Sequence, residues 1–442
     1  MKADSHLPLA RIGIVVLMVL YSVLSYFDRT IMSVAGPGMI HDFGLSETQM
    51  GAVYSAFFLG YAIFMVPGGE LADRLGPWRT LAAMGAGAGI FTATTAVAGL
   101  PSLGIFGVIP LLLMVRFLMG VVTAPLYPSC GKMNANWFAP SRQGFVWGLI
   151  AGGAGVGSAL SPSLFAWMLP ALGWRRSFSC AAAATLALAA LWSLYARDRE
   201  SQQTPVRIPR HIFSRYPENT MTNDQVHLEP HNFWALLRNR NVLLLSFGYL
   251  TVGYFEYIFF FWIYYYFGEI RHMTPKETSS YTTAIFLAWV VMSPIGGILS
   301  DLLVRKLGPA RGRPIVPVVG VLGGAVLLFW GIRLANPLAV GAALALSFGL
   351  ASSSDGAFWK ATIEAGGDNV GAACGILNTG SNVGGFIAPV LTPWIASFAG
   401  WSFSLNIGCL LAAIGAAIWF FLRPVSPTAQ NLLMVADTVS SM

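Results

Sequence analysis

The sequence predicts an all-α membrane protein with about twelve transmembrane helices in two pseudo-symmetric six-helix halves. The first observation is composition: of 442 residues, 55% are hydrophobic and only 10% are charged, whereas a soluble domain carries roughly 25% charged residues. The second is that apolar runs near the length of about 20 residues needed to cross a bilayer recur along the chain. The third is that the second half of the sequence repeats the first.

The first apolar run, residues 12–34, raises the alternative of a signal peptide. It is too long for one, contains Asp28 and Arg29, and has no small-residue cleavage site after it. We therefore interpret it as the first membrane helix. The other expected spans lie near residues 49–69, 80–99, 104–127, 143–167, 177–196, 241–266, 280–301, 314–333, 337–361, 371–397 and 401–422.

One long polar segment, residues 197–240, interrupts the spans and has no apolar periodicity. We expect it to link an N-terminal six-helix bundle, residues 1–196, to a C-terminal bundle with a short tail, residues 241–442. Lys and Arg concentrate in the loops that share a side with both termini, which predicts cytoplasmic termini in a bacterial inner membrane. The net charge of +7 lies in short loops and not in a basic stripe, so the expected partner is the lipid bilayer and not nucleic acid.

Several matches between the halves share an offset near 228 residues. Tyr26-Phe27-Asp28 matches Tyr254-Phe255-Glu256, and the segment 148–174 matches 375–401 without a gap. Parallel six-helix repeats are typical of transporters in which the substrate site lies between the halves near the membrane midplane.

A loop segment carries a resemblance to a known superfamily. Residues 69–76, Gly-Glu-Leu-Ala-Asp-Arg-Leu-Gly, resemble the loop motif of major facilitators, and a weaker copy ends at Asp301. In that superfamily the motif forms a cytoplasmic latch, so the resemblance implies a gating role for Asp73, Arg74 and Asp301. The alternative is a helix end with a charge beside a turn.

Within the superfamily the chain is similar to the anion:cation symporters, which include bacterial transporters of galactonate, glucarate and hexuronates, sialin and the vesicular glutamate transporters. The similarity lies in residues 26–29, 61–69, 116–128 and 375–385. It implies proton-coupled symport of a small organic anion, with a sugar acid as the first expectation. One position departs from the pattern: Thr123 stands where sugar-acid members commonly place a glutamate, which puts the sugar-acid assignment and the usual proton stoichiometry in doubt.

Charged residues inside a bilayer are costly and are functional candidates by default. Arg29 and Arg116 are expected to hold the anion, because a guanidinium stays protonated and can bind a carboxylate with two hydrogen bonds. The alternative is that each pairs with an internal carboxylate. Asp28, Glu256 and Asp355 are the candidates for proton coupling, although a permanent Asp–Arg pair would also explain Asp28.

Aromatic and amide side chains in the spans complete the predicted substrate site: Tyr61, Tyr257, Trp359, Asn378 and Asn382. The asparagines are four apart and share one face of a helix. For the aromatic residues, helix packing or a place in the interfacial belt is the competing interpretation.

The remaining side-chain chemistry argues against an enzyme. The four cysteines form no C-x-x-C pair, and all six histidines are expected in loops, so we expect no catalytic residue, metal or organic cofactor, and carboxylates are left to couple protons. The favoured function is proton-coupled symport by a protein that works as a monomer. An anion exchanger or exporter and a transporter-like nutrient sensor remain open alternatives.

Overall fold

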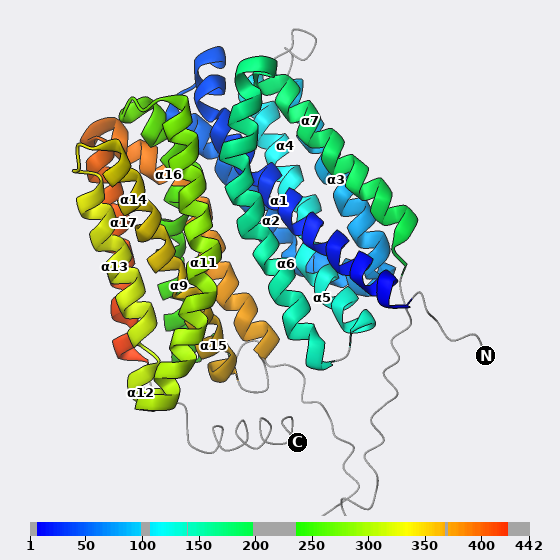
Figure 1. Cartoon of the computed structure of the whole chain (residues 1–442), viewed down its shortest axis with the longest axis vertical. Helices are drawn as coiled ribbons and strands as arrows, with labels where there is room; N and C mark the ends of the chain where they lie inside the picture. The colour runs from blue at the N-terminus through cyan, green and yellow to red at the C-terminus, as the bar shows by residue number, and fades with distance from the viewer. Residues whose placement is uncertain (1–6, 99–106, 139, 198–235, 367–369, 423–442) are drawn as a thin grey trace, which may run out of the picture.

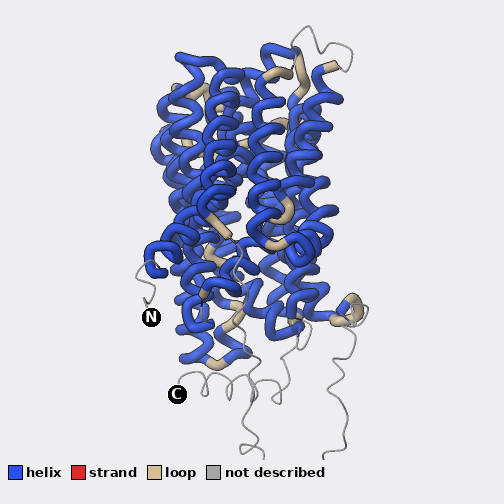
Figure 2. Tube along the Cα trace, turned by 90° about the vertical axis from the view of Figure 1, so that its right-hand side faces the viewer, coloured by secondary structure: helices blue, strands red, loops and turns tan. Residues whose placement is uncertain are grey.

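The computed structural model describes residues 7–98, 107–138, 140–197, 236–366 and 370–422. All regular elements in these ranges are helices (Figure 2). Most of the predicted linker and of the C-terminal tail lie outside the described residues. Figure 1 shows the helices gathered into two bundles, one coloured blue to green and the other green to red, with the start of α1 and the red end of the described chain toward the same end of the molecule. We call that end the terminal face and the opposite end the far face.

The N-terminal bundle is built from α1 (Leu7–Phe43), α2 (Glu47–Leu75), α3 (Pro77–Ala96), α4 (Val108–Thr123), α5 (Leu126–Trp137), α6 (Pro140–Leu160), the π-helical turn η2 (Ser161–Phe165) and α7 (Ala166–Tyr195). The C-terminal bundle is built from α9 (Arg240–Phe261), α10 (Ile263–Tyr265), η5 (Tyr266–Ile270), α11 (Pro275–Leu307), α12 (Pro309–Gly312), α13 (Ile315–Gly331), α14 (Pro337–Ser352), α15 (Asp355–Gly366), α16 (Val370–Ala399), α17 (Trp401–Ala417) and η7 (Ile418–Phe421).

The predicted count of twelve spans is confirmed. Within the described ranges, ten helical stretches are long and apolar enough to cross a membrane, and one of them, Val146–Tyr195, is 50 residues long. That stretch bends at Gly173, whose φ of 68° no helical residue adopts, and so provides two spans. The twelfth is α3, which is rich in Ala, Gly and Thr and packs along α4 and α7.

The internal repeat is visible in the backbone. Gly173 and Gly400 both have positive φ, 68° and 82°, immediately before a tryptophan. Gly76 and Gly308, each followed by proline, have φ of 86° and 79°. Only glycine adopts this conformation readily. Equivalent chain reversals in the two halves therefore depend on glycine at equivalent positions.

Two spans that the sequence predicts as single helices are broken. The fourth divides into α4 and α5 at Ala124-Pro125, because proline has no N–H and cannot continue the hydrogen-bond ladder. The tenth divides into α14 and α15 at Ser353-Ser354. There the hydroxyls donate to the carbonyls of Leu350 and Ala351, three residues earlier, in competition with the helix. A smaller difference is that His41, expected in a loop, lies in the last turn of α1.

Hydrogen bonds between the halves lie largely toward the far face. They run from Tyr265 to Glu47, Ser163 to Thr283, Ser279 to the carbonyl of Pro162 and Ser55 to the carbonyl of Phe386. Closer to the terminal face, the amide of Asn378 donates to the sulfur of Met65 at 3.2 Å. Polar contacts thus fasten the bundles together most densely at the far face.

The close approach of α2 and α16 generates a prediction. Gly51 is buried, and a Cβ there would lie 2.0 Å from the carbonyl oxygen of Pro389 in the other half. Gly51→Leu should lower the melting temperature in detergent, because overpacking costs about 1–3 kcal/mol. Gly148, exposed with no neighbour within 4 Å of an added Cβ, provides the matched control, Gly148→Leu. Equal melting temperatures for the two variants would contradict the contact.

Candidate functional site

Arg29 lies on α1 where this helix meets α2 and the C-terminal bundle. Its side chain is 3% exposed. The guanidinium carbon lies 4.5 to 5.5 Å from the centroids of four aromatic rings, which belong to Tyr26, Phe57, Phe58 and Tyr61. Ring faces attract a cation, so these four residues, called here the aromatic cage, hold the charge in place without neutralising it.

Arg116 lies on α4 behind the aromatic cage and is 1% exposed. One terminal nitrogen donates to the carbonyl of Arg29 at 3.4 Å, and the other donates to the sulfur of Met119 at 3.4 Å. The Nε atoms of both arginines have no partner. In the described part of the chain, no carboxylate forms an ion pair with either arginine. The alternative in which internal carboxylates neutralise them is therefore absent from this conformation.

Asp28 points away from Arg29, into the interior of the N-terminal bundle, as expected for adjacent helical residues about 100° apart. One carboxylate oxygen accepts a hydrogen bond from Thr185 at 2.7 Å. The other is buried without a partner. A narrow cavity beside it is lined in part by Tyr21 and Thr123. Arg116 acts on Asp28 electrostatically. The charge on one of the two candidate anion-binding arginines therefore affects Asp28.

The C-terminal bundle faces the cage with aromatic and amide groups. The ring of Tyr257 meets that of Phe58 edge-on, with 4.7 Å between the centroids. Asn378 is half-buried and contacts α2, whereas the amide nitrogen of Asn382 donates to the backbone carbonyl of Asn378 at 2.9 Å. Tyr61 and Tyr257 thus lie near Arg29, whereas Asn378 contacts α2 one helical turn after Tyr61, at Met65. The amide nitrogen of Asn382 is bound within its own helix.

The other two predicted acids, Glu256 and Asp355, lie together between α9 and α15, away from the aromatic cage. Glu256 is 9% exposed, and Asp355 begins α15. They are close enough for their charges to interact. Tyr249 donates to Asp355 at 3.3 Å. Trp359, one helical turn after Asp355, is 36% exposed and does not join the residues around Arg29.

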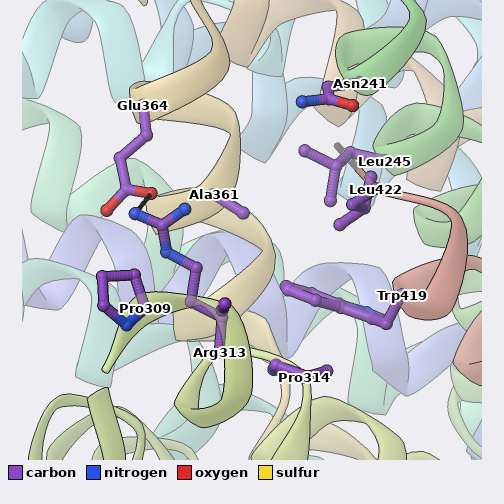
Figure 3. A pocket seen from close by; sticks show the side chains of 10 residues that line it. Asn241, Leu245, Pro309, Arg313, Pro314, Ala361, Glu364, Trp419 and Leu422 are labelled. Carbon is purple, nitrogen blue, oxygen red and sulfur yellow. Dashed lines mark ion pairs between the residues drawn. The ribbon is translucent and has the colours of Figure 1, made fainter. Parts of the chain in front are cut away.

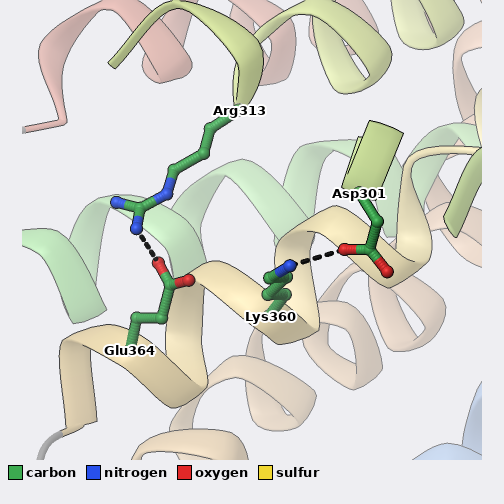
Figure 4. Close-up of polar contacts among 4 residues, drawn as sticks. All are labelled: Asp301, Arg313, Lys360 and Glu364. Atoms are coloured by element: carbon green, nitrogen blue, oxygen red, sulfur yellow. Dashed lines mark hydrogen bonds and ion pairs between the residues drawn. The ribbon is translucent and has the colours of Figure 1, made fainter. Parts of the chain in front are cut away.

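The predicted latch residues lie at the terminal face. Arg74 pairs with Glu70 in its own helix, and both side chains are exposed. Asp73 belongs to α2, but its side chain lies outside the described part of the structure. Asp301 pairs with Lys360 of α15, beside a second pair between Arg313 and Glu364 (Figure 4). The C-terminal copy of the motif therefore joins α11 to α15 within one bundle.

A pocket at the same face was not predicted. It opens between α9, α12 and α15 and is lined by Asn241, Arg313, Glu364 and Trp419, among others (Figure 3). The spacing of charged residues in the sequence does not indicate this pocket, because the residues that line it come from four distant segments of the chain. The aromatic cage was also missed, although Phe57 and Tyr61 stand four residues apart and therefore share a face of α2.

The described residues contain no group of three or more metal-ligating side chains. The side chains around Arg29 offer guanidinium and hydroxyl groups that can form hydrogen bonds.

The two kinds of buried arginine give a testable contrast. Arg116 has no acidic partner, so Arg116→Met should leave the melting temperature of ligand-free protein unchanged or raised, because a buried unpaired charge is costly. Arg313 is paired with Glu364 at 2.6 Å, so Arg313→Met should destabilise by about 1–3 kcal/mol, less than for a fully buried pair because both groups are partly exposed. A large loss of stability in Arg116→Met would mean that this arginine is structural.

Comparison with known proteins identifies the fold and the family. The model of the Major Facilitator Superfamily matches residues 18–364. A crystal structure of a bacterial homologue of the human lysosomal transporter Spinster, inward-facing and unoccupied, superposes with a TM-score of 0.75 at 17% identity, covering 95% of this chain and 97% of that one.

Curated relatives match over almost their whole length. The hexuronate transporter of Bacillus subtilis is 28% identical, covering 94% of this chain and 95% of the relative. A probable sulfoacetate transporter of Cupriavidus necator is 26% identical, with 92% and 93% covered. A probable L-galactonate transporter of Escherichia coli is 26% identical, with 93% and 89% covered. The chain is a multi-pass membrane transporter, not an enzyme, and it belongs to the Major Facilitator Superfamily.

Proposed function

We propose that the protein imports a small organic anion together with protons, by alternating access around a site at Arg29 and Arg116. The observation that carries the proposal is the pair of buried arginines without carboxylate partners. Removing a charge from water costs free energy unless an oppositely charged partner compensates for the lost hydration. A substrate carboxylate supplies that partner during transport.

The surroundings of Arg29 favour a polar organic acid. A carboxylate at the guanidinium would lie among the hydroxyls of Tyr26, Tyr61 and Tyr257 and near the amide of Asn378. Such donors and acceptors can bind substrate hydroxyl groups. A sugar acid is therefore the first substrate class, and relatives named for hexuronate and L-galactonate support it. The relative named for sulfoacetate makes a small sulfonate the second.

Proton coupling is assigned to Asp28. Its carboxylate is held by Thr185 on one oxygen and lies in the field of Arg116. An anion bound at Arg29 and Arg116 would offset that field at Asp28. Binding of the anion and of a proton would then favour each other, which is the thermodynamic condition for symport.

The two faces are assigned from the charge asymmetry of the loops. The terminal face would be cytoplasmic, and the far face, where inter-half hydrogen bonds concentrate, periplasmic. The conformation described would then be closed to the outside. Import would require these contacts to break and equivalent contacts to form at the terminal face. A single chain contains the whole proposed site, which favours a functional monomer.

The first test is thermal stabilisation of purified protein by glucuronate, galactarate, L-galactonate and sulfoacetate. One of these anions should raise the melting temperature of the wild type and of Arg11→Gln, an exposed control, and leave Arg29→Gln and Arg116→Gln unshifted. A shift that persists in both site variants would contradict the assignment of the site.

Flux tests the direction and the coupling. In proteoliposomes, an inward proton gradient should drive uptake of the stabilising anion, and Asp28→Asn should weaken the effect of the gradient while binding persists. Counterflow without any gradient effect would indicate an exchanger. Binding without flux would indicate a sensor.

A further inference from the structure

The tenth span is interrupted next to two acids that the anion site does not use. Between α14 and α15, the N–H of Ser353 still bonds to the carbonyl of Gly349, whereas that of Ser354 bonds to Ala351, three residues earlier, and Asp355 starts α15. Interrupted helices expose helix ends to an ion or substrate at membrane depth. Negative charge is favoured at a helix N-terminus, which is where Asp355 lies.

Glu256 of α9 faces this interruption from the neighbouring helix. It lies close to Ser352 and within electrostatic range of Asp355. Although Glu256 is 91% buried, its Oε1 atom has no hydrogen-bond partner. The hydroxyl of Ser352 cannot supply one while it donates to the carbonyl of Phe348 at 2.8 Å. A buried carboxyl oxygen without a partner is costly, so the arrangement calls for a ligand that this carboxyl can bind.

In the part of the chain that the structure describes, no cationic side chain pairs with either of the two acids. Among the described residues, neither forms an ion pair. The titratable groups beside them are Tyr249 and Tyr257, and α11 contributes the neutral Trp289.

The charged side chains on the helices packed against α9 are engaged elsewhere. On α15, Lys360 binds Asp301 and Glu364 binds Arg313. On α1, Arg29 lies in the aromatic cage and Asp28 is bound to Thr185. Toward the two ends of α1, Arg11 is exposed and Asp42 accepts a hydrogen bond from Trp174. The described parts of α14, α16, α17 and η7 carry no other charged residue.

The arrangement repeats that of the N-terminal half. Tyr21 and Asp28 lie beside the end of α4 at Thr123. The corresponding residues 228 positions later are Tyr249 and Glu256, which lie beside the end of α14 at Ser352. Each half thus places a buried acid next to an interrupted span. The C-terminal copy differs by having a second carboxyl, that of Asp355.

We propose that Glu256 and Asp355 together bind one proton and form a second coupling-ion site, in the C-terminal half and separate from the anion site. The carboxyl of Glu256 is 91% buried and that of Asp355, half-buried, lies within electrostatic range of it, so the two ionise together only against a repulsion. One proton bound by the pair removes this repulsion. It also provides a hydrogen-bond donor beside the Oε1 atom of Glu256, which otherwise has no partner. The hydroxyl of Tyr249 and the N-terminus of α15 stabilise the negative charge that remains.

The consequence for transport rests on the proposed function. Asp28 would be one proton site and the carboxyl pair a second. One transport cycle would then carry up to one proton more than it would with Asp28 alone. The pair would release its proton when rocking of the halves admits water to the interruption. This would restore a second proton site in a chain in which Thr123 stands in place of a glutamate.

The test is infrared difference spectroscopy of the purified, anion-free protein, titrated from acid to alkaline pH. In addition to any absorption from Asp28, wild type should show a protonated-carboxyl band that is lost on titration, and Glu256→Gln should lose that band. Asp355→Asn should keep it but lose it at a lower pH, because the neighbouring negative charge that opposed ionisation is gone. Glu269→Gln, an exposed carboxyl on η5, is the control and should match wild type.

Three results would overturn the shared site. The band could survive in full in Glu256→Gln, its pH profile could be unchanged in Asp355→Asn, or it could be lost on adding sodium chloride but not choline chloride, which would mean that sodium occupies the pair. If Glu256→Gln does not fold, the profile of Asp355→Asn decides alone. No anion is present in this titration, so a negative result would not count against anion binding at Arg29. Conversely, a failure of anion binding would not count against a proton shared by Glu256 and Asp355.

Discussion

The arrangement of the protein depends on the cost of positive charge held out of water. Arg29 and Arg116 are almost completely buried, and neither has an acidic partner in the described chain. The aromatic cage gives Arg29 some compensation through its ring faces, and a backbone carbonyl gives Arg116 a long hydrogen bond. Neither replaces a counter-ion. This is why we propose that a substrate anion completes the charge of the site during transport.

The helix architecture keeps the charged groups apart so that they do not cancel. Because Asp28 and Arg29 are adjacent on α1, they face different neighbours, the acid towards α7 and the arginine towards α2 and the other bundle. The same separation applies to Glu256 and Tyr257 on α9, where the acid faces the interrupted tenth span and the tyrosine faces the cage. Under the proposed function, adjacent positions on one helix would therefore serve an ion site inside a bundle and an anion site between the bundles.

Much of this could be predicted from the sequence, and the limits have physical causes. Apolar run lengths and the repeat predict the spans and their pairing, because bilayer thickness and helix rise leave little freedom. Arg29, Arg116, Asp28 and Glu256 are identifiable because charge is rare in such runs. The cage and the contact between Glu256 and Asp355 could not be predicted, since they depend on side chains brought together from separate spans. The interruption at Ser353-Ser354 was missed because no proline or glycine lies at the break itself, and serine only competes for helix carbonyls when packing allows it.

The most direct test of an anion site at the two arginines is a calorimetric comparison of one carboxylate with its own amide. The anion that stabilises the protein best, such as glucuronate, would be titrated against wild-type protein beside the corresponding glucuronamide, which has almost the same shape and no charge. The account predicts that the amide binds weaker by on the order of 10- to 100-fold, since a hydrogen bond to a charged group is worth about 1.5–3 kcal/mol. Equal affinities would show that the buried arginines do not read the charge of the substrate, and would contradict the central claim.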